Sequence, residues 1–352
     1  MREHLQEFDL IRVIATFTVI GIHITAGYVL VSPAGYLGNQ LARFAVPLFI
    51  IMSGFLLQYA DLDHPLDTGV FYRKRFDRIL WPYVLWSLFY IALTSVLSGQ
   101  PVSLPHLPSQ ILWGTGYYHL YFVIIIIQLY LLYPFLRKML LDHPRVVFLC
   151  SLLITLASQI ILYQNMLSII SLPAAYNMIY LVCFPVWIFY FVLGMMTALY
   201  QKQWKSALHN QTVIIGVIWF ISFVLLMVDS HYRASYGSSI RPSVMLYSVS
   251  SYFFFYVLAL RFTRALPVWV SWIAKQSFLI FLMHPFFLTA AVYLAMKIGM
   301  PNLWGRTRGM VTLYIAVTLV TLGATYLISL TPLAEKLGGS SHPIVFLQKK
   351  TL

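Results

Sequence analysis

The stretch IRVIATFTVIGIHITAGYVL, residues 11–30, decides the class of this protein. It has the length that a helix needs to cross about 30 Å of hydrocarbon, because each helical residue rises about 1.5 Å. Most of its residues are apolar or small, yet Arg12 stands near one end and His23 further along. Ionisable side chains inside a bilayer are costly, so each of these two needs a structural or a chemical explanation.

The whole chain has the composition of an integral membrane protein. Of its 352 residues, 60% are hydrophobic and only 9% are charged, and the mean hydropathy is +0.80. Apolar stretches of about twenty residues alternate with short polar gaps, whereas the alternating strands of a membrane barrel are absent from the sequence. The sequence therefore predicts an all-α, polytopic membrane protein.

We expect about ten transmembrane helices, with both termini in the cytoplasm. Their predicted ranges are 10–31, 42–60, 79–98, 119–136, 146–163, 178–200, 211–228, 246–262, 272–296 and 310–330. An even number of crossings puts both termini on one side, and placing that side inside the cell collects most of the 23 Lys and Arg residues in cytoplasmic segments. The net charge of +13 is then explained by topology and by anionic lipid, and no motif supports a nucleic-acid partner.

The chain is expected to form one membrane domain, residues 1–335, followed by a short cytoplasmic tail, residues 336–352. The segment after Leu330 contains GGSSHP and is too short to fold alone. No clear internal repeat marks the inverted halves that many transporters have.

Arg12 and His23 are expected to share one face of the first span. They lie about 16 Å apart along a helix, at three turns plus about 20° of rotation. In the predicted orientation Arg12 is near the cytoplasmic interface and His23 near the midplane, as if one groove held a cation at its mouth and a reactive centre at its depth. An imidazole suits general-base work on an alcohol. Alternatively, Arg12 snorkels to headgroups and His23 makes one interhelical hydrogen bond.

A second basic cluster, RKRFDRILW at residues 73–81, lies just before the third predicted span. Arg75 and Arg78 are one helical turn apart, so they project from one face. Guanidinium groups bind phosphates through paired hydrogen bonds, which suggests a cytoplasmic site for a phosphorylated donor such as coenzyme A. A cluster that only fixes topology explains the same residues.

Four further side chains could line a pocket: Ser53, His119, Ser277 and His284. His284 directly precedes Pro285, which has no N–H to donate, so the helix ladder is expected to open beside the imidazole. His119 stands among tyrosines, which anchor a span at the interface or stack against sugars. Ser53 is followed by glycine, and such a small pair allows close helix packing.

Two absences narrow the function. No Asp or Glu lies deep in a predicted span, which weakens a proton-coupled antiporter or a carboxylate-based hydrolase. The sequence also contains no H-E-x-x-H, G-x-S-x-G or Walker motif, and no metal site is predicted.

Taken together, these pieces resemble the acyltransferase-3 family of membrane acyltransferases, which has a similar number of spans and an Arg-x10-His pattern in the first. The matching pieces, in family order, are FDLIRVIATFTVIGIH (8–23), PLFIIMSGFLL (47–57), RFDRILWPYVLW (75–86), HLYFVIIIIQLYLLYP (119–134), FPVWIFYFVLGM (184–195) and SFLIFLMHP (277–285). The chain is most similar to the short members, which lack an additional extracytoplasmic domain.

The resemblance implies transfer of an acyl group, usually acetyl, from cytoplasmic acyl-coenzyme A to a hydroxyl of a cell-envelope polysaccharide or lipid-linked sugar, in the bacterial cytoplasmic membrane. By position, His23 would be the catalytic histidine, and Arg12, Arg75 and Arg78 would contact the donor. Acetyl-coenzyme A would be a co-substrate, with no permanently bound cofactor. The glycan acceptor, the lipid bilayer and other polysaccharide-assembly proteins are the expected partners.

Two other classes of function stay open at this point. Ten helices and a polar midplane residue suit an exporter or flippase for a polysaccharide or lipid-linked sugar equally well. A receptor or assembly partner without chemistry is the third class, and it predicts that His23 can be replaced without effect.

Overall fold

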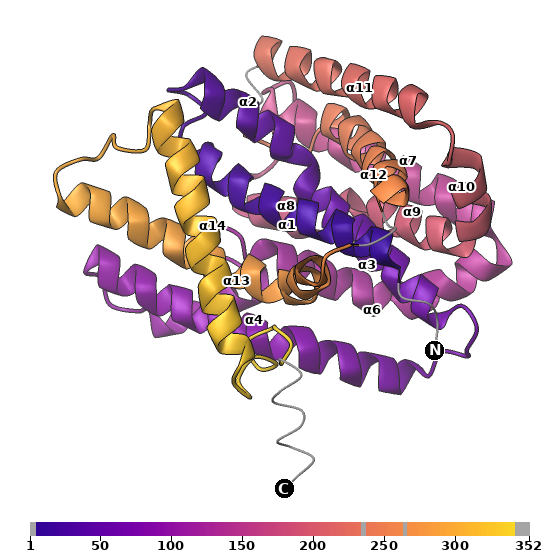
Figure 1. Cartoon of the computed structure of the whole chain (residues 1–352), viewed down its shortest axis with the longest axis horizontal. Coiled ribbons are helices and arrows are strands. Elements are labelled where there is room, and N and C mark those ends of the chain that lie inside the picture. Colours follow the sequence, from indigo (N-terminus) through magenta and orange to yellow (C-terminus); the bar gives the residue numbers. More distant parts are fainter. Residues whose placement is uncertain (1–4, 234–236, 263–265, 342–352) are drawn as a thin grey trace, which may run out of the picture.

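A computed structural model describes residues 5–233, 237–262 and 266–341, the side chain of Ala175 excepted (Figure 1). All regular structure in these ranges is helical, which confirms the predicted class. The helices of eight residues or more are α1 Gln6–Ala26, α2 Pro33–Leu41, α3 Ala45–Asp61, α4 Thr68–Ser98, α6 Tyr121–Asp142, α7 Pro144–Met166, α9 Ile188–Leu199, α10 Gln201–Leu208, α11 Thr212–Tyr232, α12 Pro242–Phe262, α13 Val268–Lys297 and α14 Thr307–Ser329. The shorter helices are η1 Ala42–Phe44, η2 Leu104–His106, α5 Leu107–Trp113, η3 Ala174–Tyr176, α8 Asn177–Val182 and η4 Phe184–Val186, where η marks a 3-10 helix.

Nine helical segments of the described chain are long and apolar enough to cross a bilayer, with α2, η1 and α3 counted as one segment, Pro33–Asp61. The outermost segments expose apolar side chains. On α11, at the upper edge of Figure 1, Val213, Val217 and Phe220 are all more than half exposed, as expected of side chains that face lipid. The prediction of a polytopic membrane protein is confirmed.

The predicted span 178–200 is wrong as a single helix. The chain there forms α8, η4 and then α9, a helix of only 12 residues. The backbone is extended at Cys183, and Pro185 has no N–H to donate to the Leu181 carbonyl, as a continuous helix would require. The sixth predicted span is therefore a broken helix, and only its short second part, α9, is a continuous apolar helix.

At this break some backbone N–H and carbonyl groups have no partner within a helix. Side chains of neighbouring helices form hydrogen bonds with these groups. Gln128 on α6 donates to the Val182 carbonyl at 2.9 Å and accepts from the Phe184 N–H at 3.1 Å. Thr155 on α7 donates to the Pro185 carbonyl at 2.8 Å. An irregular backbone is tolerated at membrane depth only where protein groups satisfy it in this way.

Two glycines allow α3 and α9 to cross at a very short distance. A Cβ atom on Gly54 would lie 2.0 Å from the Phe191 carbonyl oxygen, and one on Gly194 would lie 1.9 Å from that of Ile51. Only glycine allows the two backbones to approach so closely. The close packing that the sequence predicts beside Ser53 is thus confirmed, and it seats α3 in the middle of the bundle.

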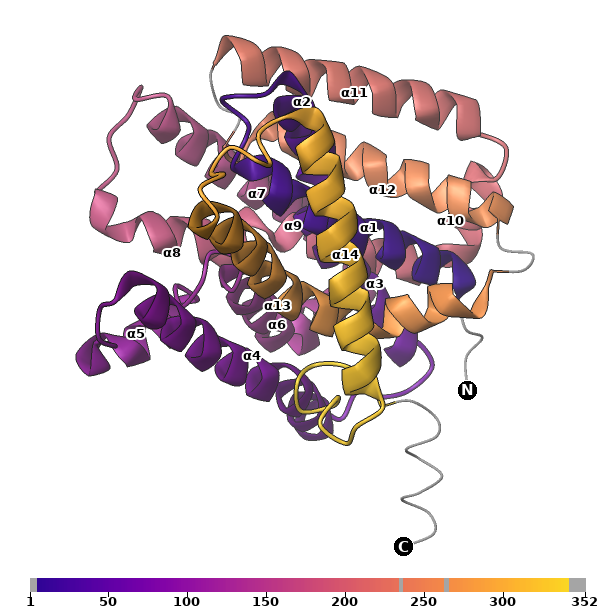
Figure 2. The same cartoon turned by 60° about the vertical axis from the view of Figure 1, so that its left-hand side comes forward.

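The inner helix α1 and the peripheral helix α4 both carry residues of the site. α1 lies at the centre of the bundle and packs against α3, α12, α13 and α14 (Figures 1 and 2). α4 lies at the lower edge in both views and packs mainly against α6. The side chain of Asp67 caps α4 by accepting from the Val70 N–H at 2.9 Å, so α4 begins well before the predicted start at residue 79. Arg75 and Arg78 therefore stand within a helix.

The end where α1 begins is called the inner face below, because the distribution of Lys and Arg assigns it to the cytoplasm. The residues after α14 return to the same face, since Gly338 and Ser340 line one cavity together with Arg12. The boundary at residue 335 between membrane domain and tail stays a prediction.

Candidate functional site

A cavity of about 560 Å³ opens among α1, α3, α4, α6 and α13 toward the inner face, and it is called the inner cavity. Its lining includes five residues singled out in the sequence: Arg12, Ser53, Arg75, Arg78 and Ser277. Of the described residues that line it, four are cationic and none is acidic, because Lys275 adds a charge to the three arginines. Such a lining attracts a ligand that carries several negative charges.

Two of the three arginines of the inner cavity, Arg12 and Arg75, contact neighbouring groups. Arg12 donates to the Ala274 carbonyl at 3.3 Å, and the nearby carboxylate of Asp9 attracts its guanidinium group. Asp9 in turn accepts a 2.6 Å hydrogen bond from Ser271 on α13. The Arg75 guanidinium lies 5.8 Å from the centre of the Phe71 ring. The positive charge is therefore positioned before any ligand binds.

A second cavity, of about 600 Å³, lies among the other ends of α1, α4 and α13 and is called the outer cavity. His23 lines it, together with Tyr118, Thr289 and Tyr293. The rest of the wall consists of aliphatic side chains, such as Leu97, and one methionine. Burial and the neighbouring Tyr117 raise the pKa of Tyr118, so this phenol stays protonated and can donate a hydrogen bond.

Arg12 and His23 therefore line two cavities rather than the single groove that their spacing suggests. A layer of aromatic and imidazole rings, the partition, separates the cavities. Phe281 lines the inner cavity and lies 5.2 Å from the buried His119 ring, measured between centroids. His284 is fully buried, and its ring lies 5.3 Å from that of His23. His119 and His284 thus lie between the cavities and line neither.

The partition brings together all three histidines that the sequence singled out. The centroid of His119 lies 6.5 Å from that of His23 and 6.1 Å from that of His284. At these separations a positive charge on one imidazole disfavours a positive charge on the other two. No group of three His, Cys, Asp or Glu side chains within the described ranges is arranged to hold a metal ion.

The ring nitrogens of the two buried histidines differ in their bonding. His284 donates from Nδ1 to the Ile280 carbonyl at 3.0 Å, whereas its Nε2 has no hydrogen-bond partner. A histidine fixed in this way presents a free acceptor nitrogen. The Leu282 carbonyl lies near His119, but neither His119 nitrogen reaches hydrogen-bonding geometry. Unsatisfied imidazoles at a partition are groups that a substrate could bond.

Tyr90 on α4 repairs the helix break that the sequence predicts beside His284. Its hydroxyl donates to the Leu282 carbonyl at 2.8 Å and accepts from the Phe286 N–H at 3.1 Å. These two groups would bond each other in a regular helix. The phenol therefore inserts into the ladder of α13 just where Pro285 interrupts it, and it ties α4 to α13 between the two cavities.

Sequence reasoning missed Lys275, Tyr90 and Phe281 as site residues. Lys275 stands two residues before Ser277, and a fourth cation near a suspected pocket was a usable signal. Tyr90 and Phe281 carried none, because aromatic side chains are ordinary in membrane helices.

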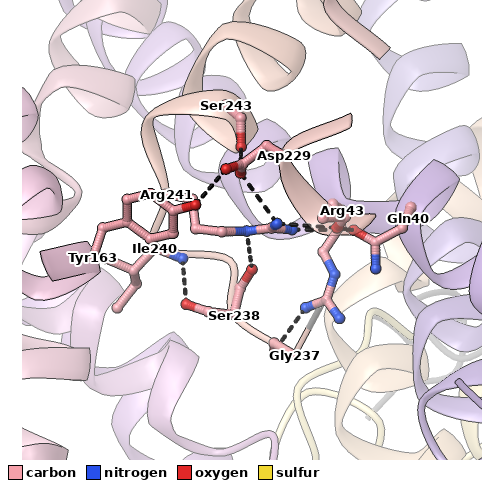
Figure 3. Close-up of polar contacts among 10 residues, drawn as sticks. Gln40, Arg43, Tyr163, Asp229, Gly237, Ser238, Ile240, Arg241 and Ser243 are labelled. Atoms are coloured by element: carbon pink, nitrogen blue, oxygen red, sulfur yellow. Dashed lines mark hydrogen bonds and ion pairs between the residues drawn. The ribbon is translucent and has the colours of Figure 1, made fainter. Parts of the chain in front are cut away.

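A third polar cluster, near the outer ends of α2 and α11, lines neither of the two cavities (Figure 3). Arg241 is fully buried, donates to Gln40 and to the carbonyl of Ser238 at 3.0 Å each, and forms an ion pair with Asp229 at 3.3 Å. Arg43 donates to the Gly237 carbonyl at 3.0 Å. Because these bonds join α2, η1, α11 and the loop before α12, the cluster holds helix ends together.

Comparisons with known proteins give one match. The acyltransferase-3 family model, described as an acyltransferase domain, matches residues 5–330. No curated protein and no solved structure matches the chain. The matched range contains both cavities except for the inner-cavity residues Gly338, Gly339 and Ser340.

Replacing Tyr90 by Phe is expected to lower the free energy of unfolding by about 1–3 kcal/mol, because a buried carbonyl and a buried N–H each lose their partner. Thermal unfolding of the purified protein in detergent measures the change. Tyr176→Phe is the control, since Tyr176 is 51% exposed. Equal melting temperatures for the two variants would show that the Tyr90 hydroxyl does not stabilise the break.

Proposed function

Because this chain belongs to the acyltransferase-3 family and is a membrane acyltransferase, we propose that it moves an acyl group from acyl-coenzyme A at the inner face to a hydroxyl of a cell-envelope glycan at the outer face. The family match confirms the resemblance seen in the sequence. Acetyl is the proposed acyl group, a polysaccharide or lipid-linked sugar is the proposed acceptor, and the bacterial cytoplasmic membrane is the proposed location.

The charge of the inner cavity is the observation that carries the donor assignment. Coenzyme A combines a nucleotide with three phosphate groups and a long, flexible thioester arm. Arg75, Arg78 and Lys275 suit the phosphates, because guanidinium and ammonium groups form charge-assisted hydrogen bonds with them. Further in, the wall is formed by apolar side chains such as Phe122 and Ile126, which suit the arm. The thioester would then reach the partition at Phe281.

The outer cavity suits the acceptor. His23 offers an imidazole on a wall that also presents the hydroxyls of Tyr118, Thr289 and Tyr293. Hydroxyl and aromatic groups bind sugars by hydrogen bonding and stacking. In this arrangement the acceptor approaches the partition from the side opposite to the donor.

The proposed step uses His23 as a general base. Its neutral imidazole takes the proton of the acceptor hydroxyl while the oxygen attacks the thioester carbonyl. The carbon–sulfur bond then breaks, and the departing thiolate recovers a proton from the imidazolium. In the second route an imidazole nitrogen attacks the thioester carbonyl, the carbon–sulfur bond breaks, and the thiolate takes up the proton that the imidazole loses. The sugar hydroxyl then attacks the acyl-imidazole, the acyl–nitrogen bond breaks, and the hydroxyl proton returns to the imidazole. In both routes the acyl end of the donor has to pass Phe281.

The alternative function, export of a polysaccharide or lipid-linked sugar, also fits a protein with one cavity on each face of the membrane. The family match and the cationic lining of the inner cavity favour acyl transfer. The two functions separate in an assay with purified protein, because an exporter moves glycan across vesicle membranes without binding or consuming acetyl-coenzyme A.

Replacing Arg75 by Gln is expected to raise the Kd for acetyl-coenzyme A about 10- to 100-fold, the worth of one charged hydrogen bond to phosphate. Arg73→Gln is the matched control. Arg73 lies on the same helix and carries the same charge, but it is exposed and does not line the cavity. Equal affinities for the two variants would place the donor elsewhere.

Replacing His23 by Ala is expected to lower the rate of acyl transfer by at least about 100-fold, because the general base is removed. Acetyl-coenzyme A binding is expected to persist, since His23 lies outside the inner cavity. Mass spectrometry of the glycan product measures the transfer. His209→Ala, which removes an exposed imidazole from the inner face, is the control. Undiminished transfer by the His23 variant contradicts the assignment.

A further inference from the structure

Residues 331–341, which follow α14, fold back against the bundle. Residues 331–341 contact two helices, and Figure 1 shows this part in yellow beside α4. Trp86 on α4 donates to the Leu337 carbonyl at 3.1 Å. Gln276 on α13 donates to the Ser340 carbonyl at 2.7 Å and accepts from the Ser340 N–H at 3.0 Å. Gln276 is only 1% exposed, so this clamp is shielded from water.

Two glycines allow the segment to lie so close to α13. Gly338 has φ of +96°, a conformation that side chains disfavour. A Cβ atom on Gly339 would lie 2.7 Å from the Gln276 side-chain oxygen and 2.9 Å from Leu279. A larger residue at position 339 would therefore either disturb the Gln276 side chain that holds the segment or push the segment off the helix.

The same residues line the inner cavity. Gly338, Gly339 and Ser340 form part of its wall, and Gln276 directly follows Lys275, one of the four cations. The segment therefore lies at the charged end of the cavity. It also lies outside residues 5–330, the range that the family model matches.

We propose that residues 331–341 form one wall of the acyl-donor site and contact the nucleotide part of acyl-coenzyme A. The inference rests on the proposed function. The N–H groups of Gly339 and Ser340 are already bonded, to the Ala334 carbonyl at 2.8 Å and to Gln276. The segment thus contributes shape, carbonyl groups and the Ser340 side chain, whereas the cations hold the phosphates.

Two substitutions in the full chain are designed to displace the segment. One alters the α13 side and the other the segment side of the contact between Gln276 and residues 339–340. Gln276→Leu removes both hydrogen bonds of the clamp from the helix side. Gly339→Val forces the segment outward and alters no helix residue. If about nine in ten molecules then lack the wall, the apparent Kd for acetyl-coenzyme A rises about tenfold, because only molecules with the wall in place bind tightly.

Matched controls exist for both substitutions. Gln159→Leu removes another buried amide that donates to a backbone carbonyl, that of Val186 at 3.2 Å, but Gln159 does not line the inner cavity. Gly323→Val adds the same side chain to a glycine whose Cβ would meet nothing within 4 Å. Melting temperatures without ligand separate an effect on folding from an effect on the wall.

A second measurement stands on its own if a displaced variant folds poorly. In Ser340→Cys, acetyl-coenzyme A is expected to slow alkylation of the new thiol several-fold, with the signal of Cys150 and Cys183 in the unchanged protein subtracted. A weaker Kd in the two displaced variants, or this protection, supports the wall. Unchanged affinity in both variants together with unprotected Cys overturns it. If the unchanged protein does not bind acetyl-coenzyme A at all, the proposed function fails, and this inference fails with it.

Discussion

The structure depends on the cost of leaving a polar group unbonded in hydrocarbon. Where the chain breaks between α8 and α9, Gln128 and Thr155 from two other helices form hydrogen bonds with the freed backbone groups. Where Pro285 interrupts α13, the hydroxyl of Tyr90 takes the place of the missing helical bond. The helices are thus joined by side chains that form hydrogen bonds with unpaired backbone groups of a neighbouring helix. These connections fix the positions at which cavities can form.

The same cost explains why the polar side chains singled out in the sequence gather around two cavities, while the cluster around Arg241 satisfies its own groups elsewhere. Cations that cannot face lipid line the inner cavity, and His23 lines the outer one. Between them, His119, His284 and Phe281 form a thin partition, tied on one side by Tyr90. A group that enters from the inner face and a group that enters from the outer face can therefore meet only at this layer, as the proposed transfer across the membrane requires.

Hydrophobic length and charge in the sequence predicted the fold class, and the structure confirms it. Six pieces of sequence in family order, the Arg-x10-His pattern among them, predicted the family. The spacing of that pattern suggested one groove, because spacing along α1 says nothing of the rings that α13 and the turn before α6 place between Arg12 and His23. Boundaries failed where capping or proline decides them, as at Asp67 and Pro185. The contribution of residues 338–340 to the inner cavity could not be predicted from the sequence, because a segment so short and polar gives no sign that it packs against the bundle. The roles of His23 and the arginines remain predictions.

Vesicles that contain the purified protein in one orientation test the central claim most directly. Acetyl-coenzyme A with a labelled acetyl group is supplied only on the side of Arg12, and envelope glycan from the host only on the side of His23, neither of which crosses the bilayer alone. The account predicts labelled glycan when the donor is on the Arg12 side and the glycan on the His23 side. It predicts no labelled glycan when both are supplied on the His23 side. Labelling only when donor and glycan share one side would contradict it.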